Sequence, residues 1–232
     1  MTTTTQIRLP GQAAAPQGPC DLSGMFIIHH AFRRDLRTFA AAVAATPAED
    51  TATWRALRDR WALFGSILHH HHTTEDESIW PLLMRRVDAG GRATLEAMEA
   101  EHGEIDPLLT ACGEGFATLA ARPDEDARRS LEIRMVAAGE RLHRHLAHEE
   151  TEALALVQAH VTPHEWEELE KNDAKGAYSL REMTSLVPWV MHQLPDETRT
   201  RMLATAGPVL SLLWRLTHRG FARREAVAFR YA

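Results

Sequence analysis

Two segments of the sequence carry the same arrangement of histidine and glutamate. "HHTTEDESIWPLL" begins at His71 and "HLAHEETEALALV" begins at His145, and both read His-x-x-x-Glu-acid followed by an apolar run. A histidine and a glutamate four residues apart lie on the same face of a helix. Imidazole and carboxylate together suit iron or manganese, and two carboxylates can bridge two metal ions inside a four-helix bundle. The repeat therefore predicts two arms of one metal site, with Glu75 and Glu149 as its carboxylates.

The apolar residues that flank each arm indicate which side of its helix faces the core. In the run of four histidines, only His71 continues the apolar stripe of its helix. This stripe consists of Leu57, Trp61, Phe64, Leu68, His71, Glu75, Ile79 and Leu82. His69, His70 and His72 are therefore expected on other faces, where a solvated role is favoured over a secondary metal site. In the other arm the stripe consists of Leu131, Met135, Ala138, Leu142, His145, Glu149 and Leu156.

Two further segments each place one histidine on an apolar stripe. These stripes are Phe26, His29, Phe32, Leu36, Phe39 and Val43, and then Leu95, Met98, His102, Ile105 and Leu109. His30 is an alternative to His29, because the stripe fixes the helix phase there only to within one residue. Two glutamates buried without a metal would each cost on the order of several kcal/mol. Four stripes that agree therefore favour a metal site over a merely polar core.

The segments that carry these residues read as four long amphipathic helices. They are expected over Asp21 to Ala45, Thr51 to Val87, Ala93 to Ala121 and Asp124 to His160, separated by "ATPAED", "DAGGR" and "RPDED". Short connections between long helices are typical of an all-α, up-down four-helix bundle. We assign this bundle to residues 21–160.

The two ends of the chain differ from the bundle. Residues 1–20 contain no basic segment followed by an apolar one, so they are expected to form a disordered leader of a cytoplasmic protein. Residues 161–232 contain capping boxes at Thr162 and Ser179 and are cut by prolines into short helices. They are expected to pack on the bundle as a helical extension. This extension could cover a pocket for an organic substrate or join two chains in a homodimer.

Composition excludes several classes of partner. The net charge of −6 gives no basic face for a nucleic acid. Cys20 and Cys112 are the only cysteines, which argues against a disulfide framework or a thiolate zinc site. The apolar segment "MLATAGPVLSLLWRL" is too short and too interrupted to span a membrane. The basic run from Arg33 to Arg37 is expected to be solvated.

Four stretches, in order, resemble the motifs of hemerythrin-like, HHE-type cation-binding domains. They are "IHHAFRRDL", "HHHHTTEDESIWPLL", "EAEHGEIDPLL" and "RHLAHEETEAL", and the resemblance covers about Asp21 to Ala159. It implies two irons per chain, joined by an oxo or hydroxo bridge. It also implies terminal ligands and bridging carboxylates at His29, His71, His102, His145, Glu75 and Glu149.

One position departs from the oxygen-carrying hemerythrins, which have a further histidine one turn beyond the third-helix ligand. This sequence has Asp106 there. The pattern therefore resembles the branch of iron-centre repair and nitric-oxide-handling proteins, with Asp106 either a ligand or a source of an open coordination position. The expected function is redox chemistry on oxygen, nitric oxide or peroxide, as in an oxidoreductase. The alternatives are an iron- or oxygen-sensing, storage or oxygen-binding module without turnover.

Overall fold

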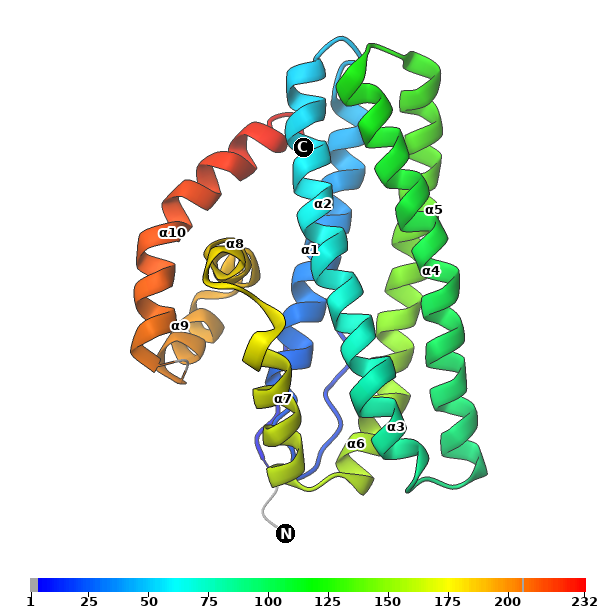
Figure 1. Cartoon of the computed structure of the whole chain (residues 1–232), viewed down its shortest axis with the longest axis vertical. Coiled ribbons are helices and arrows are strands. Elements are labelled where there is room, and N and C mark those ends of the chain that lie inside the picture. Colours follow the sequence, from blue (N-terminus) through cyan, green and yellow to red (C-terminus); the bar gives the residue numbers. More distant parts are fainter. Residues whose placement is uncertain (1–3, 206) are drawn as a thin grey trace.

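Four long helical segments run up and down beside one another and form the bundle in the computed structural model of the chain (Figure 1). The structure describes residues 4–205 and 207–232, and the side chains of all of these except residues 173–177. Every regular element within these residues is a helix. The expected all-α bundle is therefore confirmed.

The four segments follow the expected order, and two of them contain a change of helix type. The first is α1 (Ser23–Ala45) and the third is α4 (Ala89–Ala121). The second consists of α2 (Thr51–Thr74), η1 (Glu75–Ile79) and α3 (Trp80–Met84). The fourth consists of α5 (Glu125–His148), η2 (Glu149–Ala153) and α6 (Leu154–His160).

The helix α4 begins four residues earlier than the sequence predicts. The carboxylate of Asp88 accepts a hydrogen bond from the backbone N–H of Gly91 at 3.0 Å and so caps the helix. Because this cap satisfies a backbone donor of the first turn, Gly90 and Gly91 are helical rather than part of a break.

The elements η1 and η2 are π-turns, and each begins at one of the two glutamates of the repeat. The N–H of Trp80 bonds to the carbonyl of Glu75, and the N–H of Leu154 bonds to that of Glu149, five residues back in each case. A π-turn holds one more residue than an α-turn, so the buried face beyond it slips by one position. The buried residues are accordingly Leu83 and Val157, whereas the stripes predicted Leu82 and Leu156, which are half-buried.

Two apolar clusters fill the bundle, one on either side of the predicted metal donors. One cluster contains Phe39, Trp61 and Phe116, and the other contains Ile79 and Leu95. The polar residues between them are therefore enclosed in a medium of low polarity, where electrostatic interactions are strong.

Residues 4–20 of the leader are folded against the bundle, so the expected disorder is wrong for the part that the structure describes. Ile7, Leu9 and Cys20 are buried in the second apolar cluster. The side-chain amide of Gln12 donates to the carbonyl of Phe26 at 2.8 Å. The leader contributes apolar side chains to the core, and this burial offsets the entropy lost on ordering.

The last part of the chain forms four helices beside the bundle (Figure 1). These are α7 (Pro163–Ala177), α8 (Leu180–Met191), α9 (Asp196–Thr205) and α10 (Gly207–Ala228). Helix α8 contacts α1, and α10 contacts α2. Among the described residues, none of the helices combines the length and apolar character that crossing a bilayer requires.

A buried network of charges joins these helices to the bundle. Arg60 of α2 donates to Asp35 of α1 at 2.5 Å and to Glu225 of α10 at 2.6 Å. The indole of Trp189 on α8 also donates to Asp35, at 2.7 Å. Burial opposes the charge of Asp35, but the guanidinium groups of Arg34 and Arg60 outweigh it and lower its pKa. Arg33, Arg34 and Asp35 are thus buried, and the expected solvated face is wrong for these residues because α8 and Glu150 contact them.

Candidate metal centre

The first group of donors is formed by His29 of α1, His71 of α2, and the two glutamates at which the π-turns begin. Its four donor atoms lie within 4.8 Å of one another and all four residues are buried. The Nε2 atoms of His29 and His71 are 3.1 Å apart. The Nε2 of His29 lies 3.1 Å from Oε2 of Glu149, and that of His71 lies 3.2 Å from Oε1 of Glu75. These donors could hold one metal ion.

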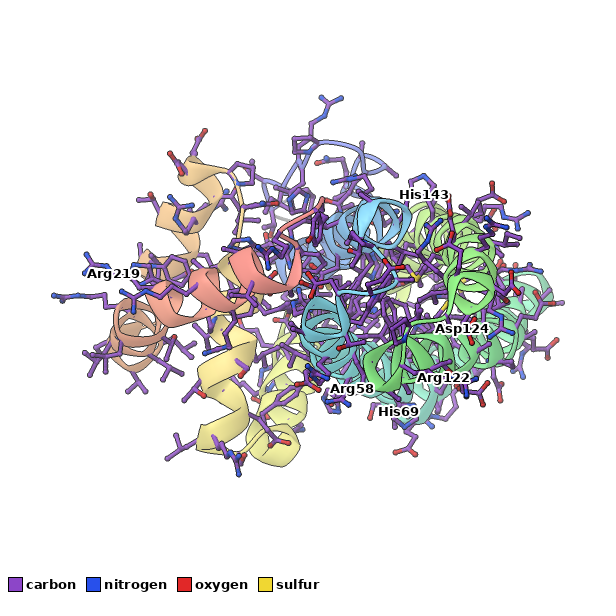
Figure 2. All side chains as sticks on the ribbon, turned by 90° about the horizontal axis from the view of Figure 1, so that it is seen from above. Arg58, His69, Arg122, Asp124, His143 and Arg219 are labelled. Atoms are coloured by element: carbon purple, nitrogen blue, oxygen red, sulfur yellow. The ribbon has the colours of Figure 1, made fainter. Side chains whose placement is uncertain are left out.

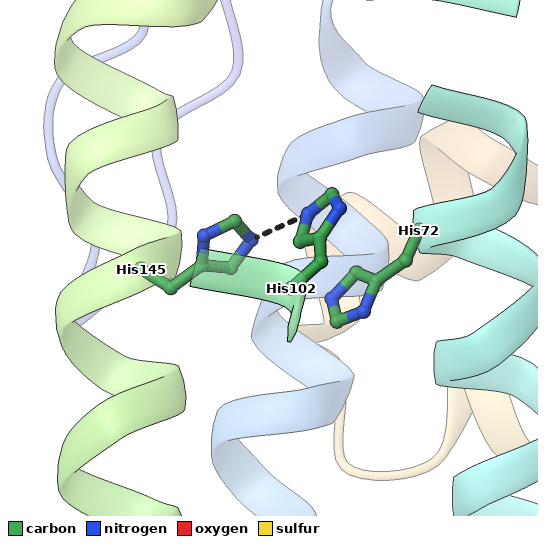
Figure 3. Close-up of side chains that lie close together, drawn as sticks. All are labelled: His72, His102 and His145. Atoms are coloured by element: carbon green, nitrogen blue, oxygen red, sulfur yellow. Dashed lines mark hydrogen bonds between the residues drawn. The ribbon is translucent and has the colours of Figure 1, made fainter. Parts of the chain in front are cut away.

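The second group consists of three buried histidines from three helices, His72, His102 and His145 (Figure 3). The Nε2 atoms of His102 and His145 are 3.2 Å apart. The ring of His72 stacks on that of His102, with centroids 3.9 Å apart and an interplanar angle of 11°. Neither ring nitrogen of His72 has a hydrogen-bond partner among the described residues. A buried imidazole in this state is costly, and a metal ion would satisfy it.

Carboxylates connect the two groups. Oε1 of Glu75 lies 3.2 Å from Nε2 of His71, and its Oε2 lies 3.4 Å from Nε2 of His102. Glu149 interacts electrostatically with His29 and His71 of the first group and with His145 of the second. Glu75 therefore contacts both groups, whereas Glu149 contacts the first group and interacts with the second electrostatically.

A second layer of carboxylates fixes which ring nitrogen of three histidines carries hydrogen. Nδ1 of His29 lies 3.0 Å from Oε1 of Glu150, and Nδ1 of His102 lies 3.0 Å from Asp76. Nδ1 of His145 lies 2.9 Å from Oε2 of Glu101. An ionised carboxylate only accepts hydrogen bonds, so Nδ1–H donates in each case, and Nε2 is the nitrogen left to bind a metal ion once any proton on it is released. We assign the tautomers on this basis.

With hydrogen held on both Nδ1 atoms, the Nε2 atoms of His102 and His145 would face one another as lone pairs, and a cation between them would relieve the repulsion. At 3.2 Å their mutual repulsion is strong in a buried site. Two imidazole nitrogens bound at right angles to one ion, each about 2.1 Å from it, would lie about 3 Å apart. Burial and the neighbouring His145 lower the pKa of His102, which disfavours a proton as the cation. The donor set therefore fits a metal ion.

The first group has a different electrostatic balance. Burial alone would lower the pKa of His29, but the carboxylates of Glu149 and Glu150 outweigh it and raise that pKa to about 9. The positive charge of His29 in turn lowers the pKa of Glu149 against the opposing effect of burial. Metal binding at His29 must therefore displace a proton, so this site gains affinity as the pH rises.

The two groups contain six of the residues that the sequence predicts for the site, namely His29, His71, Glu75, His102, His145 and Glu149. Among the described residues, Asp106 joins neither group. It lies on the exposed side of α4, while Ile105 takes the buried position next to it. The structure thus gives no support to Asp106 as a ligand. His30 is buried but also lies outside both groups.

The expected solvated position of His72 is wrong. Adjacent helix positions point about 100° apart, and α2 has two neighbours in the bundle, α1 and α4. His71 therefore contacts His29 on α1, while His72 contacts His102 on α4. His69 is exposed at the periphery of the bundle (Figure 2), and His70 is half-buried against Tyr178.

The second-layer acids are functional residues that the stripes did not identify. Asp76, which lies outside the apolar stripe of its helix, contacts His102. Glu150 is fully buried and receives hydrogen bonds from Arg33 and Gln12 as well as from His29. A signal for both was present, because an acid follows the glutamate in each copy of the repeat.

Removing the carboxylate charge behind His145 should weaken metal binding. We expect Glu101→Gln to lower metal affinity by about 10- to 100-fold, because Glu101 holds His145 with Nε2 toward the site. Half-buried His148 shares the same carboxylate at 2.9 Å and should become more mobile. Competition with a chromophoric chelator measures the affinity.

The matched control is Glu104→Gln. Glu104 is on the same helix and also pairs with a residue of α5, Arg141, at 2.6 Å, but it is exposed. Equal affinity losses in the two variants would show that the contact of Glu101 with His145 has no special role.

The chain matches the family model described as the hemerythrin HHE cation binding domain over residues 25–157, more than half of its length. Comparison with curated proteins and with solved structures gave no match. The matched segment contains all seven donors of the two groups and ends before α7.

Proposed function

Because this chain belongs to the hemerythrin HHE cation-binding family, we propose that it binds about two iron ions per chain in the two donor groups. The observation that carries this proposal is the position of Glu75, whose two oxygens lie beside imidazoles of different groups. We assign His29 and His71 to one ion and His72, His102 and His145 to the other. Glu75 and Glu149 would be shared.

The choice of iron rests on the chemistry of the donors. All seven are imidazole or carboxylate, a mixture that suits iron or manganese. Two bridged irons, when bound, supply electron transfer to or from oxygen, peroxide or nitric oxide. We propose redox chemistry on such a small molecule as the function of the site.

The protein's own contribution is to hold the donors and to exclude water. Glu150, Asp76 and Glu101 keep the hydrogen on Nδ1 of their histidines and so leave Nε2 available. The apolar clusters on both sides limit the access of water to the donors, all of which are buried. The group with His29 and His71 has one imidazole fewer than the group with His72, His102 and His145. This difference supports binding of the small molecule at the first group.

Reversible oxygen binding is the second candidate, and the number of imidazoles is compatible with it. The expectation of an open position rested on the missing histidine at Asp106. His72 contributes a fifth imidazole from α2 instead. With this residue in place, the number of histidines no longer separates the site from that of an oxygen carrier.

Absorption spectroscopy separates the two candidates. The iron-loaded protein is prepared without oxygen, exposed to air and then deoxygenated by repeated evacuation. A redox centre should change its spectrum in air and keep the new spectrum after oxygen is removed. A spectrum that returns fully to the starting form over several cycles would reject redox turnover with oxygen and establish carriage.

Substitution of His72 tests the assignment of the ligands. His72→Ala should lower the iron content from about two ions per chain to about one or fewer, because the second group loses one of three imidazoles. His69→Ala is the matched control from the same run and should retain the full content, since His69 is exposed. Metal analysis of both proteins decides. Undiminished iron in His72→Ala would remove this residue from the site.

A further inference from the structure

A cavity of about 390 Å³ lies between the bundle and the C-terminal helices, next to the proposed metal centre. On the bundle side it is lined by residues of α1, α2 and η1, and it is covered by residues of α7, α8 and α9. Its size falls in the range of pockets that bind small organic molecules, about 300 to 1,000 Å³.

One wall of the cavity is the metal centre itself. His71 and Glu75 both line it, and both belong to the first donor group. A molecule in the cavity would therefore contact the group with fewer imidazoles.

The cover of the cavity comes from outside the segment that matches the family. Trp166, Leu169, Leu186, Val190 and Met202 follow residue 157, where the match ends. The buried network of Arg60, Asp35 and Glu225 joins α10 to the bundle, and Trp189 of α8 also bonds to Asp35. The cavity is thus a property of this chain's extension and does not follow from membership of the family.

The lining residues indicate the chemical class of the occupant. Most are apolar, and three are methionines, whose flexible side chains adapt to irregular shapes. Two carboxylates, Glu75 and Glu170, line the cavity, while none of its described lining residues is lysine or arginine. In the metal-free protein, an anion such as a fatty acid would have to leave its charge in a largely apolar cavity, which is costly.

We propose that this cavity binds an uncharged, largely apolar organic molecule and holds it against His71 and Glu75. Its role as the substrate of the centre rests on the redox function proposed above, whereas its binding does not require iron. The proposal therefore names a substrate class for the centre in addition to a small oxidant.

Binding is tested with N-phenyl-1-naphthylamine, an uncharged probe that fluoresces in apolar surroundings, and with the full chain in metal-free and iron-loaded forms. We expect saturable fluorescence in both forms. In the metal-free form, 1-decanol should displace the probe, and decanoate should do so at least about 10-fold less well, because its charge would lie in a largely apolar cavity. Equal displacement by decanoate would overturn the uncharged class.

Two substitutions that fill the cavity locate the binding site. Val190→Trp on α8 and Met202→Trp on α9 should each weaken probe binding by at least about 10-fold and leave the iron content unchanged, because neither residue is a metal donor. Ile133→Trp is the control, since Ile133 is 72% exposed on α5 and distant in sequence from the cavity residues. Undiminished binding in both cavity variants, or no saturable binding by the wild type, would overturn the proposal.

The proposed di-iron function and the proposed binding cavity can be rejected independently, because iron content and probe binding are separate measurements. A protein that binds the probe but takes up no iron would reject the proposed di-iron function and support the cavity. A protein that takes up iron but does not bind the probe would support the di-iron function and reject the cavity. If one cavity variant misfolds and loses iron, the other variant still tests where the probe binds. The comparison of displacement by 1-decanol with displacement by decanoate tests the uncharged class in the wild type.

Discussion

Replacing Glu75 with alanine should lower the iron content from about two ions per chain to below about one. Glu75 lies within 3.2 Å of His71 in one group and 3.4 Å of His102 in the other, so its loss affects both. A ligand present at about 100 to 1,000 times its dissociation constant stabilises the folded state by about 3 to 4 kcal/mol. Glu75→Ala should lose most of this stabilisation. Metal analysis and thermal unfolding with and without iron measure the two effects.

The control for this variant is Glu77→Ala. Glu77 is in the same π-turn but is exposed, so its removal should change neither the iron content nor the gain in stability on iron binding. Glu149→Ala should behave like Glu75→Ala, because Glu149 begins the other π-turn and contacts His29. Full iron content in both Glu75→Ala and Glu149→Ala would mean that neither carboxylate is a bridge.

Replacing Arg60 with leucine should destabilise the protein by about 3 to 5 kcal/mol, the cost of removing one partner from a buried ion pair. Asp35 and Glu225 would then remain buried without the guanidinium that bonds to both. Since Glu225 is on α10 and Asp35 on α1, the extension should separate from the bundle before the bundle unfolds. Urea unfolding followed by tryptophan fluorescence would detect this through buried Trp189 on α8.

Arg58→Leu provides the comparison. Arg58 is two residues away on the same helix and pairs with Asp59, but both side chains are largely exposed. Exposed pairs contribute about 0 to 1 kcal/mol, so the urea midpoint should barely move. Similar midpoints for the Arg60 and Arg58 variants would show that the buried network does not hold the extension.

The sequence predicted the four helical segments and six of the candidate donors, because both follow the helical spacing of apolar residues. A residue that continues an apolar stripe lies on the core side of its helix, and this rule placed His29, His71, His102 and His145 correctly toward the core. His72 was missed because the rule assigns one inward face to each helix. A helix between two neighbours has two inward faces, and His72 lies on the second.

The slip of the buried face beyond each glutamate was not predictable from the stripes. Leu82 and Leu83 are both leucine, and Leu156 and Val157 are both apolar, so either register fits the sequence. The choice depends on the π-turns, which begin at the two glutamates of the proposed centre. Asp76 and Glu150 were visible as a repeated residue type, but their partners His102 and His29 lie on other helices.

The folding of the leader against the bundle also has a consequence for the modularity of the domain. Gln12 donates to Oε1 of Glu150 at 3.0 Å, and the backbone N–H of Ala13 donates to Oε2 at 3.2 Å. Glu150 in turn orients His29, so residues upstream of the family match help to position a donor inside it. Residues 25–157 are therefore not an interchangeable unit. Transplanting them, or placing an affinity tag against the leader, would alter the hydrogen bonds that orient His29.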